Sequence, residues 1–334
     1  MSRPGAGDAL RHVALLCRGQ ADYRAGVTGF IRDALARDDP VLAAVPAQRA
    51  LLLHTALGRD AARVSFADLT EVGRNPALII PAIRAFTEHQ PAGHASIVCE
   101  PAWPGRTSPE LVETVRHEAL VNLALADTPA AILCPYDRSR LPRHVLTDIR
   151  CTHPMLSWHG ATWPSDGFAV PAVVPARCEQ PLPRPPTSAE SLSYDVDLRA
   201  VREFVARRAV RAGLPDSRVG DLVLAVSEVA ANTLRHTSGP GTLSIWRDRS
   251  TILCEVRDQG WIADPLVGRQ SPLGLPGRQG LWVVNQMCDL VQIRTGPKGS
   301  TVRMFMLLGR AAQRPRRGLR RLGAAVGWLR LHTS

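Results

Sequence analysis

Three polar side chains, Glu228, Asn232 and His236, follow one another at steps of four residues in a mostly apolar stretch. Steps of four keep side chains on one face of an α-helix, and the stretch predicts a helix over residues 217–236. The oxygen of Asn232 is a hard ligand that suits Mg²⁺ when nucleotide phosphates supply the other ligands, and the Glu228 carboxylate can polarise a hydroxyl. Taken alone, this spacing is more typical of a solvated polar helix face.

Three short motifs that contain glycine follow this predicted helix along the chain. Asp258 and Gly260 end a predicted strand, and Thr301 begins another. Between them, the start of a predicted helix carries Gly277, Arg278, Gly280 and Leu281. A carboxylate at a strand end can accept an exocyclic amine, and glycines at a helix start expose backbone amides to phosphate. Together, the groups suggest an adenine nucleotide.

In order and spacing, these residues resemble the ATPase domain shared by histidine kinases, gyrases and heat-shock chaperones (the GHKL type), over about residues 196–309. The compact size, the short lid and the Glu-x-x-x-Asn-x-x-x-His box look most like the anti-sigma-factor serine/threonine kinases. The resemblance implies ATP and Mg²⁺ as cofactors, with Asn232 as magnesium ligand, Glu228 as general base and Asp258 as the adenine contact. The other implied nucleotide-binding residues are His236, Gly260, Gly277, Arg278, Gly280, Leu281 and Thr301.

One position departs from that family. Arg278 stands where the family usually has a further glycine in the phosphate loop, so the close approach of the backbone to phosphate is in doubt. The guanidinium could contact phosphate directly. A solvent-facing arginine is the equal alternative.

In the N-terminal half, short apolar runs alternate with helical patterns. The predicted strands are residues 12–17, 40–45, 63–68, 95–100 and 130–135, and the clearest predicted helices are residues 22–37 and 109–125. This alternation favours a parallel α/β sheet covered by helices, in which ligands bind beyond the carboxyl ends of the strands.

Residues 11–156 resemble a sensory domain of methanogen and methylotroph regulators, the MEDS type. The residues that carry this resemblance are His12, Cys17, Phe30, Asp68, Glu118, Cys134, Tyr136, Asp137, Thr152, His153 and Pro154. The resemblance implies sensing of a signal or an unknown small ligand rather than catalysis. His12, Cys134 and Asp137 lie near the ends of predicted strands, where a ligand could reach them, although a structural role is the commoner one for each.

The predicted organisation has four parts. They are a sensory domain (residues 1–170), a linker with six prolines (171–193), the ATP-binding domain (194–309) and an arginine-rich tail (310–334). In the ATP-binding domain the predicted helices are residues 197–212, 217–236 and 279–286, and the predicted strands are residues 242–247, 251–258, 289–295 and 300–308. Helices grouped against a mainly antiparallel sheet predict an α+β sandwich.

The net charge of +11 is concentrated at the C-terminus. Residues 310–334 hold seven arginines and no acid, which leaves +4 for the rest of the chain. Without a helix-turn-helix or zinc motif, we expect no direct DNA binding. Leu319, Leu322, Val326 and Leu329 form an apolar stripe that could lie on an anionic membrane or a partner, while a loosely ordered end is the alternative. Nearly all basic residues are arginines, since Lys298 is the one lysine.

No leader-like or membrane-spanning stretch is evident, so we expect a cytoplasmic protein. The seven cysteines are scattered without a CxxC pair and predict reduced thiols. A loose group of metal-capable side chains matches no tight ligand spacing, and consists of His144, Cys151, His153 and His159.

The leading hypothesis is a regulator that phosphorylates a serine or threonine of an anti-sigma antagonist protein and so controls sequestration of a sigma factor. The alternative is a non-catalytic module in which ATP gates partner binding. A histidine kinase is less favoured, because the proline-rich linker occupies the place of its phosphoacceptor helices. The sequence leaves open the sensed signal and whether two copies pair as a homodimer.

Overall fold

The computed structural model describes residues 9–90, 93–169, 173–270 and 279–309. The chain divides into two compact units, the first ending at Cys178 and the second beginning at Glu179. Each unit has its own sheet and its own apolar core, so each is described by itself.

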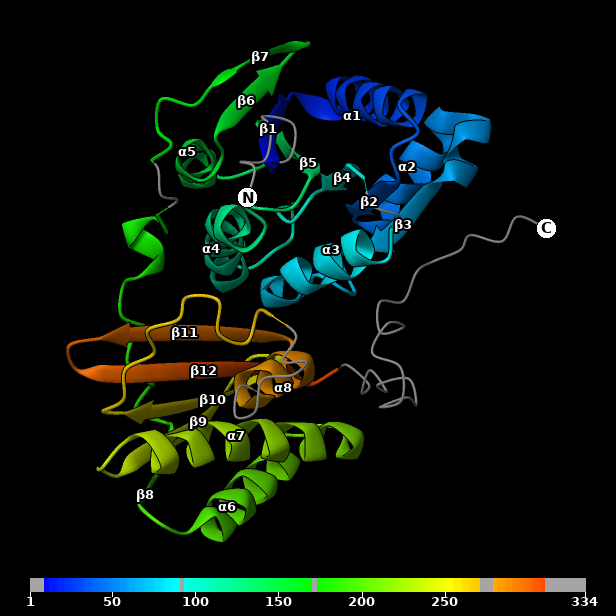
Figure 1. Ribbon diagram of the computed structural model, residues 1–334. Coiled ribbons are helices and arrows are strands. Elements are labelled where there is room, and N and C mark those ends of the chain that lie inside the picture. The colour runs from blue at the N-terminus through cyan, green and yellow to red at the C-terminus, as the bar shows by residue number, and fades with distance from the viewer. Residues whose placement is uncertain (1–8, 91–92, 170–172, 271–278, 310–334) are drawn as a thin grey trace. The chain divides into compact units, whose positions relative to one another are not determined.

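The first unit is built on a seven-stranded sheet in the order β3-β2-β4-β5-β1-β6-β7 (Figure 1). Its strands are β1 (Arg11–Cys17), β2 (Val41–Val45), β3 (Val64–Asp68), β4 (Ala95–Cys99), β5 (Ala130–Asp137), β6 (Met155–Trp158) and β7 (Ala161–Pro164). All neighbours pair in parallel except β6 and β7. The central strands β2, β4 and β5 are buried along their whole length, as expected for a sheet covered on both faces.

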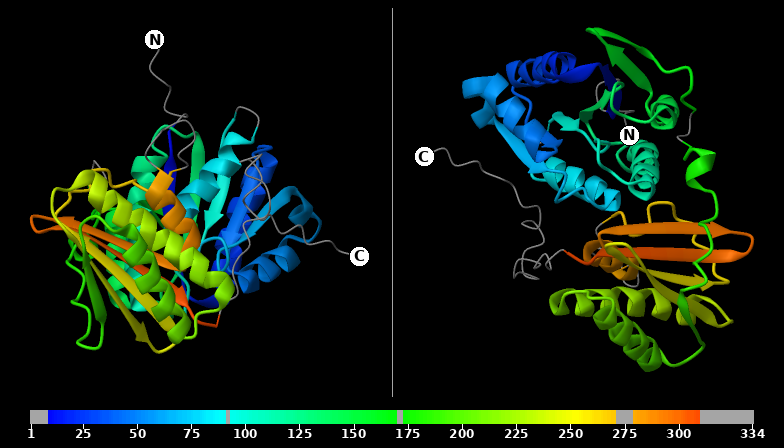
Figure 2. Two further views of the ribbon diagram at one scale, coloured as in Figure 1. Left: turned by 90° about the horizontal axis from the view of Figure 1, so that it is seen from below. Right: turned by 180° about the vertical axis from the view of Figure 1, so that it is seen from behind.

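Helices cover both faces of this sheet. They are α1 (Gly19–Ala36), α2 (Ala47–Leu57), α3 (Ile79–Glu88), α4 (Ser108–Ala124) and α5 (Arg143–Thr152), with short 3₁₀ helices η1 (Gly58–Arg63), η2 (Pro76–Leu78) and η3 (Ala176–Cys178). Helices α1 and α2 lie on one face, and α3, α4 and α5 lie on the other (Figures 1 and 2). Successive side chains of a strand point to opposite faces. In β1, Val13 and Leu15 therefore pack into the core with α1, whereas His12 points toward α4.

The fold expected for this unit is confirmed. The five predicted strands correspond to β1 through β5, with ends displaced by at most two residues. The edge strand β7 and its neighbour β6 were not predicted. Both are four residues long, and β7 is exposed at every position, so neither carries a clear apolar pattern.

The second unit has an antiparallel sheet in the order β11-β12-β10-β9-β8, with helices on one face. Its elements are β8 (Glu190–Tyr194), α6 (Leu198–Arg211), α7 (Asp216–His236), β9 (Gly241–Asp248), β10 (Thr251–Asp258), α8 (Gln279–Met287), β11 (Leu290–Gly296) and β12 (Gly299–Leu307). Helix α7 lies between α6 and α8, and all three share one core with the sheet. The predicted α+β sandwich is confirmed.

All of strand β8 except its last residue, Tyr194, lies within the segment predicted as a linker. It pairs with β9 from Glu190 to Tyr194, so this sheet starts before residue 194. The strand was missed because it is a short edge strand whose sequence, ESLSY, alternates only two larger apolar side chains with exposed polar ones.

None of the helices in the described residues is both long enough and apolar enough to cross a bilayer. The arginine-rich tail and its predicted apolar stripe lie outside the described residues.

The turn between β11 and β12 requires a glycine at one position. Gly299 has φ +105°, and a Cβ there would lie 1.9 Å from the carbonyl oxygen of Asp258. Gly296, at the other end of the same turn, has open space around its Cα. The turn thus allows the start of β12 to approach the end of β10 closely.

We therefore expect Gly299→Ala to lower the free energy of unfolding of the second unit by about 1–3 kcal/mol, because it combines a positive φ with a backbone clash. Gly296→Ala is the matched control and should stay within about 0.5 kcal/mol of wild type. Urea denaturation of both variants measures the difference. Equal stability of the two would contradict the close approach.

Candidate functional site

Helix α7 carries Glu228, Asn232 and His236, the three polar residues spaced four apart in the sequence. Its apolar side, including Leu222 and Val226, is buried in the core, which turns Glu228 and Asn232 to a half-buried position. His236 is the last residue of the helix and is exposed. The helix therefore presents a carboxylate and an amide one turn apart at the boundary between core and solvent.

Asp258, at the end of β10, is held from two sides. One carboxylate oxygen accepts a hydrogen bond from the Thr233 hydroxyl at 2.7 Å, and the other accepts one from the backbone N–H of Gly260 at 2.9 Å. Thr233 in turn accepts a hydrogen bond from the Tyr194 hydroxyl at 3.1 Å. The aspartate is only partly buried, so its remaining lone pairs can still accept the amine of a ligand.

The start of α8 lies against α7. A Cβ on Gly280 would approach the Asn232 amide nitrogen to 3.0 Å and a Glu228 carboxylate oxygen to 3.2 Å. The missing side chain therefore lets the first turn of α8 lie close against both polar groups. Leu281 is buried in the core, so only its backbone could face a ligand.

The loop after β10 is joined to β12 at the same end of the sheet. Ser300 pairs with Asp258 in the strand register, and its hydroxyl donates to the carbonyl oxygen of Gly260 at 2.9 Å. Thr301 follows on β12, partly exposed and opposite Arg257. Asp258 and Thr301 therefore lie at neighbouring positions on two paired strands, and Gly260 follows just after the end of β10.

The Asn232 oxygen already faces a cation in this structure. It accepts a hydrogen bond of 2.8 Å from the guanidinium of Arg235, an exposed side chain. A metal ion at this oxygen would require the arginine to move away. The hard oxygen of Asn232 suits a magnesium ion bound to phosphate.

Two predicted site residues, Gly277 and Arg278, lie outside the described residues. Conversely, Thr233 and Tyr194 were missed by sequence reasoning although they hold Asp258 in place. A signal for Thr233 existed, since it is a polar residue within the apolar side of α7. Tyr194 had none, because the rest of its strand fell inside the predicted linker.

In the first unit, charged side chains gather at the carboxyl ends of the strands. Glu100 follows β4, Asp137 ends β5, and Arg49 of α2 lies 3.6 Å from Glu100 and 4.0 Å from Asp137. The Tyr23 hydroxyl donates to Glu100 at 2.9 Å, and the Arg49 guanidinium lies over the Tyr23 ring. Ligands of open parallel sheets bind at this edge, so this is the candidate sensory cluster of the unit.

The electrostatics of the sensory cluster are dominated by burial. Burial raises the pKa of Glu100 to about 7, against the opposing effects of Arg49 and of the Tyr23 hydrogen bond. Burial and then the charges of Asp137 and Glu100 raise the pKa of the Cys17 thiol to about 12. Glu100 therefore titrates near neutral pH, whereas Cys17 stays protonated.

A second group, called here the interior cluster, lies inside the unit between the sheet and its α4 and α5 face. Its members are His12, Glu118, Cys134 and His153. Burial, followed by the charge of His12, lowers the pKa of His153 to about 3, so this imidazole is neutral at neutral pH. Asp137 is not a member of the interior cluster, because it lies at the carboxyl end of β5 with the sensory cluster.

The loose group noted in the sequence is not a metal cluster. Within the described residues, His153 is the one member that lies in a set of metal-capable side chains close to one another, and its neighbours there are the interior cluster. His144, Cys151 and His159 are not part of it. Closeness along the chain was a poor guide because α5 and the β6–β7 turn carry these side chains apart.

Comparison with known proteins finds a domain family for each unit. Residues 11–154 match the family described as MEDS, the methanogen/methylotroph DcmR sensory domain. Residues 193–306 match the histidine kinase-like ATPase domain. Both resemblances inferred from the sequence are therefore confirmed at the level of domains.

Among solved structures, the chain resembles the RsbU and RsbW domains of Rv1364c from Mycobacterium tuberculosis at 20% identity and a TM-score of 0.29. The likeness covers 39% of this chain and 35% of that one, so the chain spans about a third of the solved protein. No curated protein matches the chain.

The raised pKa of Glu100 predicts a pH dependence of stability. The folded state holds the Glu100 proton up to about pH 7, whereas the unfolded chain holds it only up to about pH 4.5. Protonation of Glu100 therefore stabilises the folded state fully at low pH, and this contribution to the free energy of unfolding is lost as the pH rises from about 4.5 to about 7. We expect wild type to lose about 3 kcal/mol relative to Glu100→Gln across this window. Urea denaturation at several pH values tests it, and parallel profiles would contradict it.

Proposed function

We propose that the second unit binds Mg-ATP and that the chain is a cytoplasmic signalling regulator. The observation that carries the proposal is the convergence of three groups from separate elements. Asp258 is held by Thr233, the start of α8 lies against Asn232, and Glu228 stands one turn away. The match to histidine kinase-like ATPase domains supports the same reading.

Each residue has a separate duty in this proposal. Asp258 accepts the exocyclic amine of adenine through a lone pair that neither Thr233 nor Gly260 uses. The amides at the start of α8, near Gly280, face the phosphates. Asn232 holds Mg²⁺, which neutralises phosphate charge when bound.

We further propose that the second unit is a serine/threonine kinase for an anti-sigma antagonist protein, on the strength of the Glu-x-x-x-Asn-x-x-x-His box. The acceptor hydroxyl oxygen bonds to the terminal phosphorus of ATP, the bond to the bridging oxygen breaks, and ADP leaves. Glu228 takes the hydroxyl proton. Phosphorylation would separate the antagonist from its partner and so control a sigma factor.

A nucleotide-gated binding module is the competing proposal. In such a module the same contacts hold ATP, but Glu228 does not act as a general base. In either case, we propose that the sensory cluster takes a small ligand, because Glu100 and Arg49 offer a proton-exchanging acid and a cation at one place.

The adenine contact predicts a loss of affinity in Asp258→Ala. A hydrogen bond to a carboxylate is worth about 1.5–3 kcal/mol, so ATP affinity in Mg²⁺ should fall about 10- to 100-fold. Asp248→Ala is the control, since Asp248 is an exposed aspartate at the end of the neighbouring strand β9. Equilibrium dialysis of the full chain with labelled ATP measures both. If Asp258→Ala binds like the control, the assigned contact is wrong.

Glu228→Gln separates the kinase from the gated module. It keeps the shape of the side chain and removes the proton acceptor, so a kinase should retain most ATP affinity yet lose about 10²- to 10⁴-fold in transfer rate. Asn232→Ala should lose both magnesium-dependent binding and transfer. Labelling of a verified antagonist with ATP carrying a labelled terminal phosphate is the measurement. Absence of labelling by wild type, while ATP still controls partner binding, would leave the gated module.

A further inference from the structure

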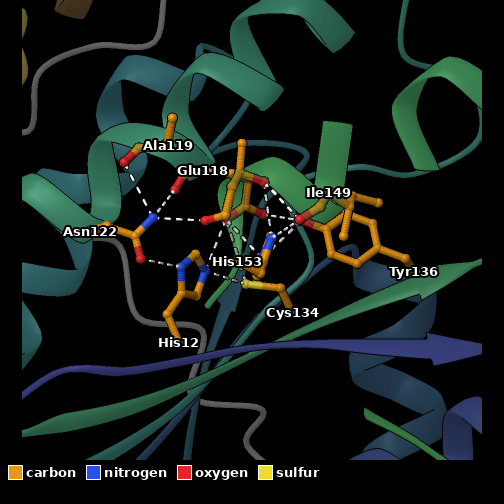
Figure 3. Close-up of polar contacts among 9 residues, drawn as sticks. His12, Glu118, Ala119, Asn122, Cys134, Tyr136, Ile149 and His153 are labelled. Atoms are coloured by element: carbon orange, nitrogen blue, oxygen red, sulfur yellow. Dashed lines mark hydrogen bonds and ion pairs between the residues drawn. The ribbon is translucent and has the colours of Figure 1, made fainter. Parts of the chain in front are cut away.

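The interior cluster of the first unit has the geometry of a metal site. Its four donor atoms, one from each side chain, all lie within 4.8 Å of one another, and all four residues are buried (Figure 3). They come from β1, α4, β5 and the end of α5, elements separated by up to about 140 residues of chain. Figure 3 shows the side chains pointing toward a common centre.

Four of the six donor–donor distances within the cluster are close to the edges of a coordination tetrahedron. His12 Nε2 lies 3.2 Å from Glu118 Oε2 and 3.4 Å from Cys134 Sγ. Glu118 Oε2 lies 3.7 Å from Cys134 Sγ and 3.5 Å from His153 Nε2. A tetrahedral zinc ion with bonds of about 2.0–2.3 Å has donor–donor edges of about 3.3–3.8 Å.

The hydrogen bonds around His12 fix its orientation and tautomer. The Asn122 amide nitrogen donates to the carbonyl oxygen of Thr152 at 2.7 Å and to that of Glu118 at 3.1 Å, which turns its oxygen toward His12. His12 Nδ1 lies 3.0 Å from that oxygen and so carries the hydrogen. Nε2 faces the centre, and it offers a lone pair there whenever it carries no proton.

His153 is held in the same way. Its Nδ1 lies 3.1 Å from the Ile149 carbonyl oxygen and 3.0 Å from the Thr152 hydroxyl, which itself donates to Ile149. Both acceptors require the hydrogen on Nδ1, so Nε2 again faces the centre with a lone pair. Metal-binding histidines typically donate their second ring nitrogen to such groups.

Glu118 also presents a single oxygen. The Tyr136 hydroxyl donates to Glu118 Oε1, which leaves Oε2 for the centre. Two imidazole lone pairs and one carboxylate oxygen therefore converge, and the Cys134 thiol is the one hydrogen-bond donor among the four central atoms. With both rings neutral, three acceptors face one weak donor in a buried space, an arrangement that a bound cation stabilises.

We propose that the interior cluster binds one zinc ion through His12 Nε2, His153 Nε2, Glu118 Oε2 and the thiolate of Cys134. Two nitrogens, a sulfur and one oxygen at tetrahedral spacing suit zinc, whereas magnesium and calcium prefer oxygen alone. Binding displaces the thiol proton to solvent. Four protein donors leave no open position, so the ion has a structural duty and joins β1 and β5 to α4 and α5.

The test uses the full chain without an affinity tag. After removal of metal by a chelator, titration with Co²⁺ should give an intense ligand-field spectrum and a thiolate charge-transfer band at one equivalent, and Zn²⁺ should displace the cobalt. Cys134→Ala should lose the charge-transfer band. Cys17→Ala is the matched control, because Cys17 is a buried thiol of the same sheet that lies outside the cluster, and it should keep the band.

A second variant keeps all four donors. Asn122→Ala removes the acceptor of His12 Nδ1 and should weaken zinc about 10- to 100-fold in competition with a chromophoric chelator, while circular dichroism shows an intact fold. The proposal is overturned if wild type takes up no Co²⁺, if the charge-transfer band survives in Cys134→Ala, or if Asn122→Ala binds zinc as tightly as wild type.

Discussion

The hydrogen bond from Thr233 to Asp258 is the contact on which the second unit's candidate site depends. It joins the middle helix of the α6–α7–α8 layer to the central strand β10, and Tyr194 extends the chain of hydrogen bonds to the edge strand β8. A carboxylate at a strand end would otherwise rotate freely in water. Held in this way, Asp258 keeps a fixed distance from the α7 face that carries Asn232. In the proposed function, recognition of a base and binding of phosphates would then occur in one rigid frame.

The first unit manages polar groups differently, because it buries them inside the sheet layer. Burying several polar side chains without compensation costs several kcal/mol, so a stable fold must satisfy them. In the interior cluster the four polar side chains contact one another. In the sensory cluster Glu100 and Asp137 pair with Arg49. The two clusters lie on β5 at positions three residues apart, Cys134 and Asp137, so one strand connects a closed interior site with an open edge.

The sequence predicted most of the fold because apolar runs bounded by turn residues identify buried strands well. The candidate nucleotide-site residues stay a prediction, and they were named from local signals, namely four-residue spacing on one helix and glycines at strand and helix ends. Strands β6, β7 and β8 were missed because such short strands have little apolar periodicity, and β7 and β8 also lie at sheet edges. The interior cluster could not be predicted, because it forms only when β1 pairs with β5. That pairing sets His12 and Cys134 two positions apart in the register, on the same face of the sheet, and strand pairing is not a local property of the sequence.

The almost complete use of arginine has a practical consequence for chemical labelling. Lys298 is the one lysine among the 334 residues, and it is exposed in the turn beside Gly299. Amine-reactive reagents attack unprotonated primary amines and leave guanidinium groups unmodified. Apart from the chain's own terminal amine, such a reagent would attach a single dye or cross-linker to the protein. That attachment point would lie next to the residue whose backbone abuts Asp258, so an environment-sensitive dye there would report on the candidate nucleotide site.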